Sequence, residues 1–263
     1  MKTSRVTFFT LIVLGLIFPM GCQNNSAEKE RKPDLIVYCE NGILAPVKEF
    51  TEYFEDSTGL KVSIQNDCAR NLTSLIHYRR ETDIFIPDTR QAIDNLTLIP
   101  PDIICDSVYL GNQMLVFIVE KNNPSKLTGT IESLTNYENG IILANPESST
   151  LGHITGVYLR QHQIYDTVMN SVLFLTTDSR GLIRNIATSH ASLAIAWKSD
   201  YLTNNIRKQV DTLSIHSGYT EYPAVAAQLT FGKNQANAKK YLKWLKQPQA
   251  VEIFEKYGIQ KPD

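Results

Sequence analysis

The segment LIVYCENGILAPVKEFTEYFEDSTGLKVSIQ, residues 35–65, predicts two strands of a sheet and the helix that connects them. Its first five residues, Leu35–Cys39, are unbroken by charge and β-branched in the middle, which is typical of a strand covered on both faces. Pro46 opens a stretch with apolar residues at helical spacing, and Gly59 closes it. Residues 61–65 are the next predicted strand.

The same alternation continues along the chain. A second helix is predicted around residues 72–79, a strand at 83–87 (DIFIP) and a further helix around 89–95. Strands that alternate with helices in this way indicate a parallel sheet with right-handed crossovers. The chain after residue 33 is therefore expected to begin as an α/β lobe.

A second α/β unit is predicted downstream of Gly111. The long strand at 114–120 could leave the first lobe, and a late strand at 222–229 could return to it. We expect an α/β fold of two lobes with a hinged cleft between them, the usual position of a small-ligand site. The expected bounds are 34–112 with 226–263 for lobe 1, and 113–225 for lobe 2.

The amino-terminal residues 1–22 read as a secretory signal. Lys2 and Arg5 precede fifteen uncharged residues, which is short for a membrane span of roughly 20 residues but suits a signal peptide. Gly21 before Cys22 predicts a lipid-modified cysteine; a plain signal peptide and an uncleaved anchor are the alternatives. Residues 23–33 are then a polar tether. We expect a lipid-anchored protein of the cell envelope, facing the periplasm or on the cell surface.

Composition excludes some classes of function. Without Lys2 and Arg5, the 26 basic residues become 24 against 27 acidic ones, so the mature net charge is −3. Basic residues form no run beyond adjacent pairs, so we expect no nucleic-acid partner. No nucleophile–base motif and no pair of catalytic carboxylates is evident, so we expect neither an enzyme nor a cofactor.

Cys39 and Cys68 end the first two predicted strands and leave three interpretations open. They could form a disulfide, which suits an oxidising compartment. They could hold a soft metal together with Glu40 or Asp67, which would make the protein a metal-binding lipoprotein. They could also be two small buried hydrophobic residues. No metal-ligand motif is matched, so no metal ligand is assigned.

Four polar segments follow predicted strands: 40–44, 67–71, 147–152 and 178–181. Helices that begin at such places direct unpaired N–H groups and partial positive charge at the edge of the sheet, where an anion can bind. Each segment taken alone is also explained by helix capping.

Several longer segments carry a family resemblance. They are LIVYCENGILAPVKEF, DIFIPDTRQAID, YLGNQMLVFIVEK, NPESSTLGHITGVYL, AIAWKSDYL and KKYLKWLKQPQAVEIFEKYGI. Together with the signal, they resemble the molybdate- and tungstate-binding proteins of ABC importers, from about residue 35 to 260. The resemblance implies the two-lobed type 2 periplasmic binding-protein fold.

The resemblance also implies a set of anion contacts, which must be transferred one residue at a time. A family serine falls at Gly42 and another near Ala69, so backbone N–H groups would have to serve there. Backbone contacts are implied at Leu151 and Ser179, and the family's tyrosine falls at Trp197, whose indole N–H can donate. Asn41, Arg70 and Thr150 complete the expected ligand-binding set.

Two carboxylates stand where the family has small neutral residues. Glu40 and Asp67 would repel an anion if they pointed into its site, and Arg70 could offset that repulsion. The alternative is that both carboxylates face solvent as caps. The expected function is the solute-binding component of an ABC importer, which captures a small oxyanion as a monomer and delivers it to a membrane permease and its ATPase.

Overall fold

A computed structural model describes residues 32–98, 102–136, 138, 140–177, 179–203 and 205–262. The predicted signal, Cys22 and most of the tether lie outside the described residues. Residues from Pro33 to the end of the chain form one compact unit. None of the helices in the described ranges combines the length and the apolar character needed to cross a bilayer.

The first lobe is built on the strands β1 (Leu35–Glu40), β2 (Val62–Asp67) and β3 (Ile84–Ile86), which pair in parallel in the order β2-β1-β3. The helices α1 (Leu44–Thr58), α2 (Ala69–Tyr78) and α3 (Arg90–Leu96) connect and flank them. Gly59 ends α1 in the left-handed conformation at φ 68°, as its position predicted.

Alternate residues of β1 face opposite sides of the sheet, which explains its unbroken apolar sequence. Leu35, Val37 and Cys39 pack into one buried cluster with α1 and the carboxy-terminal helices. Tyr38 packs into the cluster beneath α2 and α3. Because both faces are covered, each needs apolar side chains.

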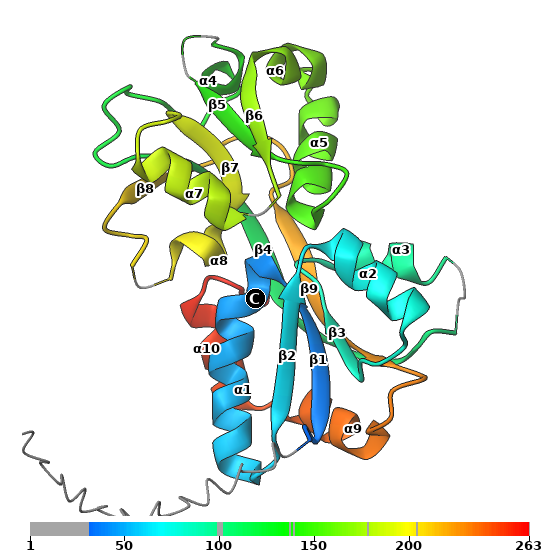
Figure 1. Cartoon of the computed structure of the whole chain (residues 1–263). Helices are drawn as coiled ribbons and strands as arrows, with labels where there is room; N and C mark the ends of the chain where they lie inside the picture. Colours follow the sequence, from blue (N-terminus) through cyan, green and yellow to red (C-terminus); the bar gives the residue numbers. More distant parts are fainter. Residues whose placement is uncertain are drawn as a thin grey trace, which may run out of the picture. The chain divides into compact units, whose positions relative to one another are not determined.

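Two long strands continue this sheet and connect it with the second lobe. Strand β4 (Ile104–Glu120) pairs with β9 (Glu221–Leu229) up to Met114, and from Leu115 onward it pairs with β7 (Leu193–Trp197). Strand β9 lies antiparallel between β3 and β4. The predicted strand at 114–120 is thus only the second half of a strand of 17 residues (Figure 1).

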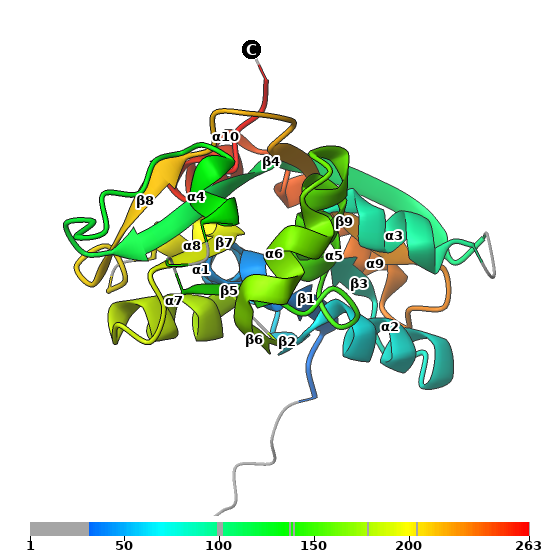
Figure 2. The ribbon, with the colours of Figure 1, turned by 90° about the horizontal axis from the view of Figure 1, so that it is seen from above.

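The second lobe contains β5 (Ile141–Ala144), β6 (Val172–Thr176) and β7 in the order β7-β5-β6, with β8 (Val210–Ser214) paired to β4. Its helices are α4 (Glu132–Thr135), α5 (Thr150–Gln161), α6 (Tyr165–Ser171), α7 (Ser179–Ala187) and α8 (Lys198–Tyr201). Strands β5 and β7 are buried throughout, with α5 and α7 packed against both (Figure 2). This lobe has its own apolar core.

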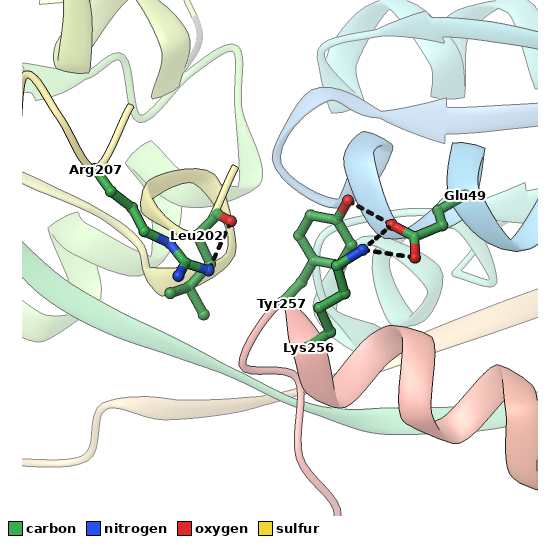
Figure 3. A network of polar contacts seen from close by, with 5 residues as sticks. All are labelled: Glu49, Leu202, Arg207, Lys256 and Tyr257. Atoms are coloured by element: carbon green, nitrogen blue, oxygen red, sulfur yellow. Dashed lines mark hydrogen bonds and ion pairs between the residues drawn. The ribbon is translucent and has the colours of Figure 1, made fainter. Parts of the chain in front are cut away.

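The chain returns to the first lobe and ends in α9 (Gln235–Trp244) and α10 (Pro248–Lys256), as the sequence predicted. Figure 3 shows how the carboxylate of Glu49 in α1 accepts hydrogen bonds at 2.8 Å from Lys256 Nζ and from the Tyr257 hydroxyl. These contacts fix the end of α10 against α1. The exact bounds of the two lobes in sequence stay a prediction.

Candidate functional site

The side chain of Glu40 lies at the centre of the site, at the end of β1. It is 1% exposed, and its two carboxylate oxygens accept hydrogen bonds from both lobes. Oε1 accepts from the backbone N–H of Thr150 at 3.0 Å. Oε2 accepts from the Thr150 hydroxyl at 2.7 Å and from the backbone N–H of Asp88 at 2.9 Å. The backbone N–H of Ala69 also faces this carboxylate and lowers its pKa. We call these donors the carboxylate cage.

Two of the cage residues begin helices, which explains why their N–H groups are available. Ala69 and Thr150 are the first residues of α2 and α5, where the helix leaves its backbone donors unpaired and its dipole favours an anion. Ser149 caps α5, because its hydroxyl accepts from the Gly152 N–H at 3.0 Å. The amide of Thr150 is therefore left to point at Glu40.

A second carboxyl group lies beside the cage. Asp88 follows β3, is 3% exposed, and its Oδ2 accepts from the indole Nε1 of Trp197 at 2.9 Å. The backbone N–H of Gly42 also faces Asp88 and lowers the pKa of its carboxyl group. Within the described part of the chain, the other oxygen, Oδ1, has no hydrogen-bond partner.

Asp88 and Trp197 fill the space that a side chain at residue 42 would need, so only glycine fits there. A Cβ atom built on Gly42 would lie 2.6 Å from Asp88 Oδ2 and 2.6 Å from Trp197 Cδ1. A serine at this position, which the family resemblance implies, would clash with both. The hydroxyl missing at residue 42 is thus replaced in space by the carboxyl group of Asp88.

Burial affects the protonation of both acids. Desolvation raises the pKa of Glu40 above its usual range, although the hydrogen bonds from the cage oppose that rise. Desolvation also holds the pKa of Asp88 well above its usual range, and the nearby charges of Glu40 and Asp200 add to it. Of the two buried carboxyl groups, Asp88 therefore favours the protonated form, whereas the hydrogen bonds of the cage favour the ionised form of Glu40.

The raised pKa of Asp88 makes stability depend on pH. The folded protein holds this proton more tightly than the unfolded chain, so the free energy of unfolding falls as pH rises from the ordinary value of 3.8 through the raised folded value. We expect the free energy of unfolding of Asp88→Asn to fall less steeply than that of the wild-type protein as pH rises above about 4. Urea denaturation at several pH values measures the free energy of unfolding of the variant and of the wild-type protein. Asp56→Asn, which changes an exposed carboxylate, is the control. If the free energy of unfolding falls equally with pH in both variants, Asp88 is not the group with the raised pKa.

Further contacts join the lobes around the cage. The Ser199 hydroxyl donates to the carbonyl oxygen of Gly42 at 2.9 Å, and the Arg180 guanidinium donates to Asn41 Oδ1 at 3.1 Å. The backbone N–H of Arg70 donates to the carbonyl oxygen of Ser148 at 3.3 Å. The two lobes therefore meet through many polar contacts, and the cleft is closed at its centre.

A cavity of about 260 Å³ adjoins the cage. It shares Ala69 and Thr150 with the cage and extends between α2, α3 and the start of α5. Its other walls include the polar residues Arg70, Thr73, Gln91, Ser148 and His153 and the acidic residue Glu147. The cavity has the donors and the size to hold part of a small solute.

The cysteines favour the simplest of the three interpretations. Cys39 and Cys68 are buried free thiols, so the structure contains no disulfide between them. Burial raises the pKa of Cys39 well above its usual range, the nearby carboxyl groups of Asp88 and Glu40 add to the rise, and Cys39 stays a thiol rather than a thiolate. No cluster of His, Cys, Asp and Glu in the described ranges is suited to hold a metal ion.

The structure brings four of the predicted residues together. Gly42, Ala69, Thr150 and Trp197 surround the two carboxyl groups. Leu151 instead packs in the core of the second lobe, and its neighbour Thr150 makes the contact. The others lie nearby: Arg70 on the cavity wall, Asn41 bonded to Arg180, and Ser179 buried at the start of α7.

The interpretation of Glu40 as a solvent-facing cap is wrong, because its carboxylate is buried in the cage. Asp67 does make local bonds at the start of α2, accepting from the Cys68 N–H at 2.7 Å and from Asn71 Nδ2 at 3.0 Å. Asp88 was not predicted. The signal that could have identified it was the missing side chain at Gly42, because a lost serine leaves space that another residue must fill.

Comparison with known proteins agrees with this geometry. The family of bacterial extracellular solute-binding proteins matches residues 35–260. The molybdate-binding protein ModA of Escherichia coli is 26% identical, over 93% of this chain and 95% of ModA. YvgL of Bacillus subtilis, named as an ABC transporter substrate-binding lipoprotein, is 21% identical over 97% of this chain and 98% of its own length. The periplasmic molybdate-binding protein of Azotobacter vinelandii superposes with a TM-score of 0.75 at 15% identity, covering 87% of this chain and all of that one.

The chain therefore belongs to the family of bacterial extracellular solute-binding proteins, and it has their two-lobed fold. It is a solute-binding component of an ABC importer, and the relatives named above are solute-binding proteins. The permease and the ATPase of such an importer are its partners in transport.

Proposed function

We propose that the protein captures a small oxyanion of the molybdate, tungstate, sulfate or phosphate type in the cleft between its lobes. The observation that carries this proposal is the carboxylate cage. Four donors from both lobes converge on one anionic group, and two of them are the N–H groups of helix starts. Donors arranged in this way fit an anion from outside as well as they fit Glu40.

Closure of the cleft follows from the same contacts. An anion held by Ala69 and Asp88 in the first lobe and by Thr150 in the second stabilises the closed arrangement, because the open one separates these donors. The ModA relative, named as molybdate-binding, supports an oxyanion. The donor set differs from the hydroxyl-rich set that the family resemblance implies.

Attachment to the membrane through a lipid on Cys22 is part of the same proposal. It rests on the basic head, the apolar run and the Gly21-Cys22 pair at the end of the signal, and a relative named as a lipoprotein supports it. An anchored binding protein stays near its permease. The proposal places the protein at the cell envelope as a monomer.

Calorimetric titration with the four oxyanions tests the proposed function. The material is the chain from residue 33 onward, which forms a compact unit by itself, and sodium chloride at equal ionic strength is the control. We expect saturable heat from at least one oxyanion. Trp197 and Trp244 are the two tryptophans of the chain, so in Trp244→Phe the remaining fluorescence should also respond. Absence of heat from all four oxyanions would reject an oxyanion as the solute.

A further inference from the structure

Glu40 occupies the donors that an external anion needs. Its carboxylate takes the N–H of Asp88 and both donors of Thr150, and it is almost completely buried. A second anion bound to the same donors would have to share them and lie against a like charge in a dry site. An external anion and the Glu40 carboxylate therefore exclude each other from the cage.

The attachment of Glu40 to β1 makes it a strong competitor. It is held near the cage at a high effective concentration, and its charge-assisted hydrogen bonds are of the same kind as those an oxyanion would make. When only a small fraction of the molecules has a vacant cage, the apparent dissociation constant rises by the inverse of that fraction.

The adjoining cavity gives the displaced side chain a place to go. The cavity meets the cage at Ala69 and Thr150, and the guanidinium-bearing residue Arg70 lines its wall. A carboxylate that leaves the cage can pair there with a guanidinium, which lowers the free energy of the displaced arrangement.

We propose that Glu40 is a built-in competitor for the anion site: its carboxylate holds the cage closed, and an external anion binds by displacing it. This inference rests on the proposed function and names the residue that sets its affinity. It also explains why the site contains an acidic residue, since the acid takes the place of the solute. An external anion enters only when its own hydrogen bonds to these donors outweigh those of the carboxylate, so Glu40 also sets specificity.

Binding and hydrogen exchange in Glu40 variants test this proposal. The variants are Glu40→Ala, which empties the cage, and Glu40→Gln, which keeps the shape but turns one oxygen into a donor; Glu52→Gln, on the exposed side of α1, controls for net charge. We expect Glu40→Ala to bind the oxyanion at least about tenfold more tightly than the wild-type protein, and Glu52→Gln to differ by less than about threefold.

Exchange of backbone amides, followed by NMR, gives a second readout that needs no added anion. The amides of Asp88 and Thr150 should exchange at least about tenfold faster in Glu40→Ala, and an added oxyanion should restore their protection. The Gly152 amide, which is bonded to Ser149, is the internal reference and should stay unchanged. Unchanged exchange at Asp88 and Thr150 would overturn the proposal.

The outcomes separate this inference from the proposed function. If the wild-type protein binds an oxyanion and Glu40→Ala binds it equally or more weakly, Glu40 is no competitor and the proposed function stands. If neither the wild-type protein nor any variant binds an oxyanion, both are overturned.

Discussion

Trp197→Ala is expected to lower the free energy of unfolding by about 3–5 kcal/mol, the usual range for removing a fully buried tryptophan. Trp197 is 0% exposed, packs edge-to-face on Tyr222 with ring centroids 6.0 Å apart, and reaches across to Asp88. Its loss leaves a cavity beside Gly42 and removes the donor to a buried carboxyl group. Both effects act at the contact between the lobes.

Urea denaturation measures this effect, and two variants separate its causes. Trp197→Phe keeps most of the ring volume but lacks the N–H, so it should lose less than Trp197→Ala and still leave Asp88 without its indole donor. Trp244→Phe makes the same substitution at the other tryptophan, away from the cage. It shows how far a change from tryptophan to phenylalanine alone alters the free energy of unfolding. A loss below about 1 kcal/mol in Trp197→Ala would contradict a structural role at the lobe contact.

Gly152→Ala adds one methyl group at the start of α5, and we expect it to disturb this turn more than a methyl group added elsewhere at the site. A Cβ atom at Gly152 would lie 2.3 Å from the carbonyl oxygen of Asn145 and 2.7 Å from that of Ala144, and backbone atoms have little room to move. The first turn of α5 must shift, which takes the donors of Thr150 away from Glu40. We expect a loss of about 3 kcal/mol of stability and at least tenfold weaker oxyanion binding.

Gly156→Ala is the matched control, one turn further along α5. Its Cβ would meet mainly the flexible end of Arg160, at 3.2 Å. Alanine is also about 1 kcal/mol better than glycine inside a helix, so this variant should be neutral or more stable. Thermal unfolding and calorimetric titration compare the two. Equal stability and equal binding in both variants would show that the close approach at Gly152 does not position Thr150.

Much of the fold could be predicted because local patterns determine it. Apolar runs marked β1, β3 and the end of β4, and Gly59 marked the end of α1. The first half of β4 was missed because residues such as Asp106 and Ser107 interrupt its apolar pattern, while its pairing with β9 supplies the hydrogen bonds. Strand β8 was missed for a similar reason, because Asp211 and Thr212 interrupt it. Strand β6 is an unbroken apolar run, VLFLT, at the edge of the sheet, and its sequence could have identified it.

The candidate site was only partly predictable, because its central feature depends on long-range packing. The segments that hold Gly42, Ala69 and Thr150 follow from the order of strands and helices, whereas Trp197 was implied by the family resemblance. Burial of Glu40 follows from neither, because a glutamate after a strand usually faces water. Its burial needs donors from Asp88 and Thr150, which lie 48 and 110 residues away in the chain. Only folding brings these donors to it.

A crystal structure of the protein grown with the oxyanion that binds most tightly in calorimetry tests the central claim most directly. We expect the anion's oxygens within hydrogen-bond distance of the backbone nitrogens of Asp88 and Thr150, with the Glu40 side chain turned into the adjoining cavity. An anion bound elsewhere, with Glu40 still held by Thr150 and Asp88, would contradict both the cage as the solute site and Glu40 as its competitor.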